Sequence, residues 1–122
     1  MKLHAAGPST YNTITGYGEG YVMVNNRRHD SSVIVMPDQI VPWNVSEFSG
    51  ITLADFEKLK TLNAEILLLG TGPQQRFPHP SLTAPLATAG IGVEVMDLKA
   101  ACRTYNILVA EERKVAAALL FA

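Results

Sequence analysis

The stretch Ala-Glu-Ile-Leu-Leu-Leu-Gly-Thr-Gly-Pro, residues 64–73, decides the fold class of this chain. It is a short apolar run that ends in a Gly-x-Gly-Pro turn, the pattern of a strand buried on both faces. Strands of this kind belong to parallel sheets covered by helices, and such sheets leave a crevice at the carboxyl ends of their strands. The stretch therefore predicts an α/β fold and indicates where a functional site would lie.

Length and composition predict one domain over residues 1–122, with an ordinary globular mix of 48% hydrophobic and 17% charged residues. The net charge is −1 and the basic residues are scattered, which argues against a nucleic-acid partner. No run approaches the ~18 apolar residues that a membrane span needs. Because the N-terminus also lacks a signal or transit pattern, we expect a soluble cytoplasmic protein without membrane insertion.

The first part of the chain is rich in β-formers and predicts antiparallel hairpins. Strand-like runs cover residues 13–15, 21–24 and 32–36, and the segment 16–20 between the first two predicts a bulge or tight bend. Asn25-Asn26 predicts a turn between the last two runs, with Arg27-Arg28 in that turn. Pro42 restricts the extended piece 40–43 to a sheet edge.

From residue 50 onward, helix signals alternate with strands. Thr52 and Asp55 predict a capped helix with Leu53 on its apolar face, and the buried strand follows. After a Pro-rich loop over 72–80, a short helix should carry Pro85 in its first turn. A strand over 92–96 and a helix that Asp97 caps come next. Residues 114–121 fit a helix or a strand nearly equally by periodicity, and the β-α-β-α-β order slightly favours a strand.

Candidate functional residues gather after the buried strand and in the last helix. Gly70-Thr71-Gly72 lacks the third glycine and the Gly-Lys-Ser/Thr of nucleotide-binding loops, so a plain strand-end turn is favoured. Arg76 and Glu94 would meet near the crevice if their strands are neighbours, although a structural or surface role is more common. Thr104-Tyr105-Asn106 is unusual in a helix interior and indicates a hydrogen-bond network or, second, a binding surface.

The sequence contains no arrangement of residues that is typical of catalysis or of metal binding. The three histidines match no zinc spacing, and the single cysteine, Cys102, lies on an apolar helix face that favours a buried, inert thiol. No Ser-His-Asp or Cys-His arrangement and no paired carboxylates share a motif. We therefore predict no metal and no cofactor, and a non-enzymatic role is favoured over an enzymatic one.

Several segments together resemble the Mth-like family of domains of unknown function, which includes the mitochondrial complex I assembly factor 3 and the adipogenesis-associated Mth-like domain-containing protein. These segments are 16–18, 69–72, 90–96, 101–108 and 112–119. The resemblance implies a three-layer α/β domain with a mixed central β-sheet, and it favours a strand over 114–121. It assigns catalytic roles to none of the matching residues, and we expect that this chain lacks the presequence of the mitochondrial factor.

Two functions therefore stand side by side. The first is a binding or assembly-type protein whose contact surface uses Tyr17, Tyr21 and Trp43, because aromatic residues are favoured at interaction hot spots. The second is a site for an anionic metabolite at the strand ends, in either a small-molecule binding protein or an enzyme. Its candidate residues are Gly70, Thr71, Gly72, Arg76, Glu94, Thr104, Tyr105 and Asn106. The sequence indicates neither the partner nor the oligomeric state.

Overall fold

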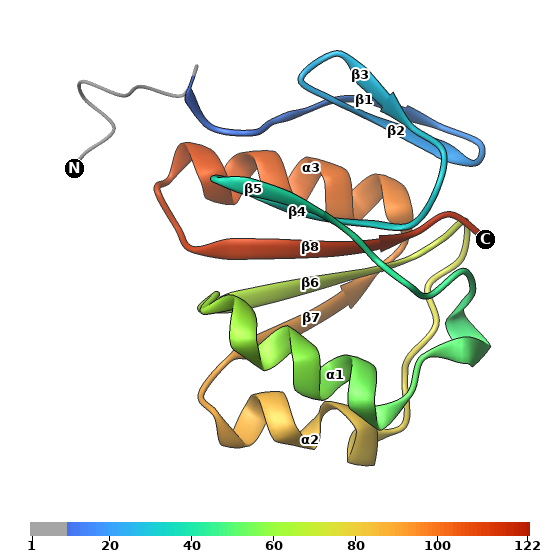
Figure 1. Cartoon of the computed structure of the whole chain (residues 1–122), viewed down its shortest axis with the longest axis vertical. Helices are drawn as coiled ribbons and strands as arrows, with labels where there is room; N and C mark the ends of the chain where they lie inside the picture. The colour runs from blue at the N-terminus through green and yellow to red at the C-terminus, as the bar shows by residue number, and fades with distance from the viewer. Residues whose placement is uncertain (1–9) are drawn as a thin grey trace.

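The computed structural model describes residues 10–122 and has three layers, with a central sheet between two covering layers (Figure 1). The elements are β1 (Ile14–Gly18), β2 (Tyr21–Val24), β3 (Arg27–His29), β4 (Val33–Met36), β5 (Gln39–Pro42), the 3-10 turn η2 (Phe48–Gly50), α1 (Leu53–Leu59), η3 (Lys60–Leu62), β6 (Ile66–Thr71), α2 (Pro80–Thr88), β7 (Gly92–Met96), α3 (Leu98–Ala110) and β8 (Val115–Leu120).

The central sheet is mixed and five-stranded, in the order β5-β4-β8-β6-β7. Strand β6 pairs in parallel with β7 and with β8, while β4 pairs antiparallel with β8 and β5. The predicted C-terminal βαβαβ half is therefore confirmed, and the ambiguous segment 114–121 forms the strand β8. All six residues of β8 are buried because it lies at the centre of the sheet, which explains its uniform apolar run.

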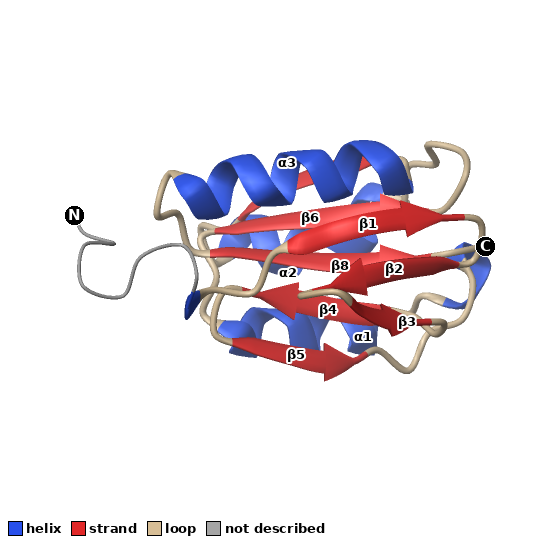
Figure 2. Cartoon of the chain, turned by 90° about the horizontal axis from the view of Figure 1, so that it is seen from above, coloured by secondary structure: helices blue, strands red, loops and turns tan. Residues whose placement is uncertain are grey.

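Helices and a second sheet cover the two faces of the central sheet (Figures 1 and 2). Helix α3 and the three-stranded antiparallel sheet β1-β2-β3 lie on one face, and α1 and α2 lie on the other. Leu68 belongs to the core cluster on the α3 side, and Leu67 and Leu69 belong to the cluster on the α1–α2 side. Because successive side chains of a strand point to opposite faces, burial on both sides requires the continuous leucine run of β6.

The first sheet confirms one sequence expectation and corrects another. The predicted tight bend is the turn at Glu19-Gly20 between β1 and β2, and a register shift between Ile14 and Gly16 lies within β1. Asn25 and Asn26, with φ of 53° and 65°, do form a turn, but it leads into β3. The expectation of a turn at Arg27-Arg28 is therefore wrong, because pairing with β2 makes a strand from residues without strong β-propensity.

The helices on the α1–α2 side confirm the caps and correct two details. The Thr52 side chain accepts from the Asp55 N–H, and the Asp55 side chain accepts in return, so the capping box is present. Leu53 is nevertheless 47% exposed rather than buried. Pro85 is the sixth residue of α2 and not in its first turn, because Pro80 takes the first helical position, where the missing N–H costs nothing.

Candidate functional site

The turn after β6 is organised around the hydroxyl of Thr71, which is fully buried. This hydroxyl donates to the carbonyl oxygen of Gln74 at 2.6 Å and accepts from the backbone N–H of Arg76 at 3.1 Å. The Thr71 side chain therefore fixes the conformation of the first residues of the loop after β6. The same hydroxyl also lies 3.3 Å from the carbonyl oxygen of Met96 in β7, so it joins the loop to the neighbouring strand. This loop forms the surface at the carboxyl ends of the parallel strands.

The two glycines of the Gly-Thr-Gly turn allow close approach of other parts of the chain. A Cβ atom on Gly70 would lie 2.9 Å from a methyl carbon of Leu119 and 3.1 Å from the Cβ of Ala101, so glycine lets α3 pack directly on β6. Gly72 has a φ of +86°, and a Cβ there would lie 3.0 Å from the backbone of Ala122. The default interpretation of the turn, small residues that let the backbone pass, agrees with both contacts.

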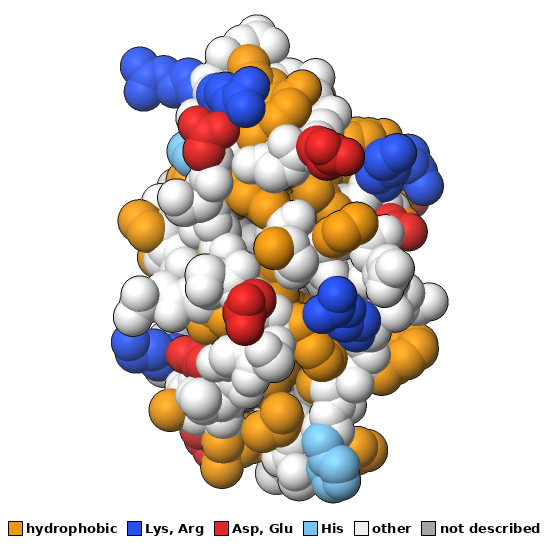
Figure 3. Space-filling model, turned by 90° about the vertical axis from the view of Figure 1, so that its right-hand side faces the viewer, with side chains coloured by type: hydrophobic (Ala, Val, Ile, Leu, Met, Phe, Trp, Pro, Cys, Tyr) orange, Lys and Arg blue, Asp and Glu red, His pale blue; other side chains and the backbone are white. Residues whose placement is uncertain are grey.

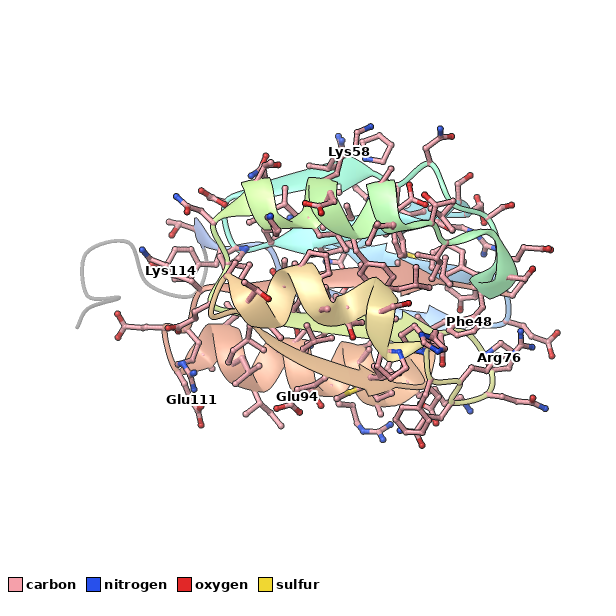
Figure 4. All side chains as sticks on the ribbon, turned by 90° about the horizontal axis from the view of Figure 1, so that it is seen from below. Phe48, Lys58, Arg76, Glu94, Glu111 and Lys114 are labelled. Atoms are coloured by element: carbon pink, nitrogen blue, oxygen red, sulfur yellow. The ribbon has the colours of Figure 1, made fainter. Side chains whose placement is uncertain are left out.

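Arg76 and Glu94 lie apart in the structure (Figure 4). The guanidinium carbon of Arg76 is 6.0 Å from the centre of the Phe48 ring, within the range of a cation–π contact. Glu94 is exposed on β7, directly opposite Leu68 in the register of β6. Glu94 lies on β7, next to β6, and Arg76 lies in the loop that follows β6, but the Arg76 side chain lies toward η2 and forms no charged pair with Glu94.

The Thr104-Tyr105-Asn106 segment of α3 joins the helix to the N-terminal part of the chain. The buried Tyr105 hydroxyl donates to the carbonyl oxygen of Asn12 at 2.8 Å. The Asn106 amide nitrogen donates to the Ile14 carbonyl at 2.7 Å, and its oxygen accepts from the Ile14 N–H at 2.9 Å. Burial, with a smaller effect of Asp38, raises the pKa of Tyr105, so its proton stays available for this bond.

The aromatic residues predicted for protein contact make different contacts in the structure. The Tyr21 ring covers Gly18 on the outer face of the small sheet, and the guanidinium of Arg28 stacks 4.0 Å above the ring centre. Tyr17 packs against the core on the α3 side, and its hydroxyl oxygen accepts from Arg103 at 3.3 Å. Trp43 follows β5, and the cavity beside it is also lined by Gly20, the residue before Tyr21. The three side chains therefore lie toward the same end of the molecule but make different contacts.

Trp43 borders two cavities, one of about 470 Å³ and one of about 300 Å³. The larger is lined by residues 30–32, 43–46 and 121–122 together with Gly20, so it brings the β1–β2 turn close to Trp43. The smaller is a groove between α1 and the β4–β5 hairpin, with Asp55 and Lys58 at its polar side. Cavities with an aromatic wall are suited to side chains of a partner.

The same end of the molecule exposes a second aromatic residue, Phe77, whose side chain is 71% exposed in the loop between β6 and α2. Figure 3 shows this end, with small groups of hydrophobic side chains between polar atoms and single charged groups. Phe77 and Phe48 are not among the residues that the sequence predicts for protein contact. The signal available was an aromatic residue next to Pro78 in a Pro-rich loop, where no regular element buries it.

The single cysteine lies in the core of the protein. Burial raises the pKa of the Cys102 thiol to about 12, which confirms the expectation of an inert cysteine. Among residues 10–122, no group of three or more His, Cys, Asp or Glu side chains could hold a metal ion. No helix within this described part is long and apolar enough to cross a membrane.

Residues 14–120 match the family described as "Protein of unknown function (DUF498/DUF598)". The chain belongs to this family. The match runs from the first residue of β1 to the last residue of β8, so the family pattern includes both sheets and all the helices between them. The Mth-like resemblance of the sequence is confirmed with it, because a solved structure of an Mth938-like domain from Bordetella pertussis has a TM-score of 0.82 and 34% identity to this chain. That comparison covers 98% of this chain and 92% of the other.

Two further relatives show how far the similarity to this chain extends. A crystal structure of a Bordetella parapertussis protein shares 41% identity with a TM-score of 0.87, over 93% of this chain and 98% of that chain. The protein named NADH dehydrogenase [ubiquinone] 1 alpha subcomplex assembly factor 3 of Xenopus tropicalis is 33% identical over 109 residues. This alignment covers 88% of this chain but only 60% of the relative. The mixed α/β fold is thus confirmed, and the relative has residues outside the shared part.

The eight predicted ligand-binding residues lie in separate parts of the structure. Thr71 and the two glycines shape a turn, while Tyr105 and Asn106 hold the N-terminal sheet on α3. Thr104 is half-buried on α3, whereas Arg76 and Glu94 are exposed. The structure does not bring the eight residues together around one cavity, and a small-molecule site there stays a prediction.

Proposed function

We propose that this chain is a non-enzymatic protein-binding factor of the assembly type. The observation that carries the proposal is its similarity to assembly factor 3, at 33% identity over 88% of this chain. The geometry supports a binding role because the potential nucleophile Cys102 is buried with a raised pKa. The surface at the carboxyl ends of the strands, in contrast, exposes aromatic side chains.

The contact surface that we propose includes Trp43, Phe48, Arg76 and Phe77, called here the aromatic end. A phenylalanine that is 71% exposed loses contact with water when a partner covers it, and aromatic and arginine side chains dominate binding energy in interfaces. The cation–π contact between Arg76 and Phe48 holds both side chains in place, which lowers the entropy cost of binding. The earlier candidates Tyr17 and Tyr21 remain secondary contacts.

Affinity capture from a native lysate, with crosslinking before lysis, tests this proposal. The Phe77→Ala and Trp43→Ala variants should each recover much less of a specific partner than the wild type. The matched control is Ile107→Ala, because Ile107 is 57% exposed on α3, away from the aromatic end. Thermal unfolding of each variant separates loss of contact from loss of fold, and the exposed Phe77 carries the test if the half-buried Trp43 proves structural.

The assembly role has its own readout, because an assembly factor changes the state of its partner. Deletion of the gene should leave the captured partner in complexes of lower mass on native gels, and re-expression of the wild type should restore the larger complex. Re-expression of Phe77→Ala should restore it poorly. The proposal fails if no partner is recovered at near-physiological concentration, or if the partner's complexes are unchanged by the deletion.

A further inference from the structure

The two sheets end in four edge strands, and three of these are closed to further pairing. The Asn106 side chain occupies both backbone groups of Ile14 in β1. Strand β3 carries the exposed side chains of Arg27 and Arg28, and charged residues on an edge disfavour the addition of another strand. Strand β5 carries Pro42. The fourth edge, β7, is the least protected: it has no proline, it carries one exposed charged residue, Glu94, and a side chain occupies only its Val95 carbonyl.

The orientation of Pro42 shows how the β5 edge is closed. The backbone N–H of Trp43 donates to the carbonyl oxygen of Ser32 at 3.0 Å, so the backbone groups of Trp43 face toward β4. Backbone groups alternate in direction along an antiparallel strand, and the nitrogen of Pro42 therefore faces outward. Its ring stands where an N–H would otherwise meet an added strand, and the β4 pairing loses nothing.

The same alternation identifies the free groups of β7. The Gly92 N–H donates to the carbonyl oxygen of Glu65 at 3.0 Å, so Gly92 and Glu94 face β6 while Val93 and Val95 face outward. The Val95 carbonyl accepts from the side chain of Gln75 at 2.9 Å. Within residues 10–122, β7 pairs only with β6. The outer edge therefore presents the N–H groups of Val93 and Val95 and the carbonyl of Val93.

The side chains of β7 define what an added strand should carry. Glu94 is exposed on the α3 side of the sheet, whereas Val93 and Val95 are half-buried and pack against the core on the α1–α2 side. Residues of an added strand alternate between the same two faces. A basic residue beside Glu94 would gain a favourable cross-strand pair, and apolar residues beside the two valines would extend the core.

We propose that β7 is a docking edge for an extended segment of a partner protein in which apolar and basic residues alternate. Such a segment would add to the central sheet as a sixth strand, with main-chain bonds for affinity and side chains for specificity. The inference rests on the proposed function in that the occupant is a protein. Continuity supports it, since Gln75, which covers part of this edge, directly precedes Arg76 and Phe77 of the aromatic end.

The probe is a fluorescein-labelled peptide in which lysine and valine alternate. It has about seven residues, the length of an ordinary strand. Fluorescence anisotropy at low ionic strength should show saturable binding to the wild-type protein, because dissolved salt weakens the Glu94 contact. The same peptide with glutamate in place of lysine should bind about fivefold more weakly or worse, since like charges then lie side by side.

Two proline variants give a matched pair for this experiment. Val93→Pro places a proline ring on the outer edge of β7, as Pro42 does on β5. The hydrogen bonds to β6 stay in place because the Val93 N–H faces outward. Binding of the lysine–valine peptide should fall about tenfold or more. Ile40→Pro is the control, because the Ile40 N–H also faces outward but lies on the edge that Pro42 already closes. Its binding should equal that of the wild type.

Two surface variants keep the proposal testable if the proline variants lose their fold, which circular dichroism reports. Gln75→Ala frees the Val95 carbonyl, and peptide binding should tighten about twofold to threefold. Glu94→Lys should reverse the preference, so that the glutamate–valine peptide binds better than the lysine–valine peptide. Both positions are exposed, so neither change should affect stability.

The proposal is overturned if the wild type shows no saturable binding, or if Val93→Pro and Ile40→Pro bind the peptide equally well. A concentration-dependent dimer that Val93→Pro abolishes in analytical ultracentrifugation would also overturn it, because a second copy would then occupy the edge. Capture of the cellular partner separates the two proposals. If Val93→Pro still captures that partner and Phe77→Ala does not, the docking edge is wrong while the proposed function stands.

Discussion

The side chain of Asn106 in α3 is bonded to both backbone groups of Ile14 in β1, at 2.9 Å and 2.7 Å. A single amide therefore acts as the neighbouring strand that the edge of the small sheet lacks. The two residues are 92 positions apart, and this contact joins the N-terminal sheet to the C-terminal βαβαβ half. It explains why a poor helix former stands in the interior of α3.

Asn106→Ala should lower the free energy of unfolding by about 2–3 kcal/mol, because it leaves the Ile14 N–H and carbonyl partly buried without partners. Urea unfolding monitored by circular dichroism measures the change. Ile107→Ala is the matched control, since the neighbouring side chain is exposed, and it should stay within about 0.5 kcal/mol of the wild type. Equal stability of both variants would show that the Asn106 clamp contributes nothing.

Gly70→Ala should destabilise the protein by about 1–3 kcal/mol, because the new Cβ atom would overlap a methyl group of Leu119 and press on Ala101. Either α3 must move away from β6 or the Leu119 side chain must change its rotamer. Gly50→Ala is a suitable comparison because a Cβ atom there meets no atom within 4 Å. Thermal unfolding distinguishes the two, and a Gly70→Ala variant as stable as Gly50→Ala would refute the close packing.

Elements that depend on neighbours in sequence could be predicted from the sequence. The leucine run of β6 predicts a strand that is covered on both faces. The Thr52–Asp55 capping box also lies within one helical turn. The position of Asp97 before an apolar helix pattern likewise identified its cap, since its side chain accepts from the Ala100 N–H at 2.8 Å. In each case, the interaction that forms the element is complete within a few residues.

Features that depend on distant partners could not be predicted. Strand β3 consists of Arg27, Arg28 and His29, and only pairing with β2 makes it a strand. The Asn106 side chain signalled a hydrogen-bond network, but nothing local identified Ile14 as its partner. The candidate ligand residues lie in separate places for the same reason, and the small-molecule site stays a prediction. Arg76 follows β6 and Glu94 lies on the neighbouring β7, yet the contact with Phe48 directs Arg76 elsewhere.

Cys102 should resist thiol reagents in the folded protein, because burial raises its pKa to about 12 and keeps the thiol protonated. Ellman's reagent at about pH 8 should label it only when the core opens, so the rate should rise with urea in parallel with unfolding. Fully unfolded protein should label at the rate of a free cysteine. Rapid labelling in the absence of urea would show that the cysteine side of α3 opens locally.

Glu65→Gln should remove part of the acid dependence of stability. The hydrogen bond from Arg113, followed by the Lys114 N–H, lowers the pKa of Glu65, and Arg113 Nε lies 2.8 Å from its carboxylate. A carboxyl with a lowered pKa in the folded state stabilises it above the unfolded pKa, and this contribution is lost as the pH falls through the folded value. The wild type should therefore exceed the variant in urea midpoint at about pH 7, and the difference should shrink as the pH falls through the lowered pKa of Glu65 in the folded state.

The exposed Glu111→Gln is the control for this titration, since Glu111 lies near the same end of β8. Its urea midpoint should follow that of the wild type at every pH. Salt should reduce the difference between the wild type and Glu65→Gln, because Arg113 and Glu65 are both accessible to solvent and ions screen their attraction. A difference that persisted unchanged at low pH would assign the effect of Glu65→Gln to packing at the start of β6 rather than to its charge.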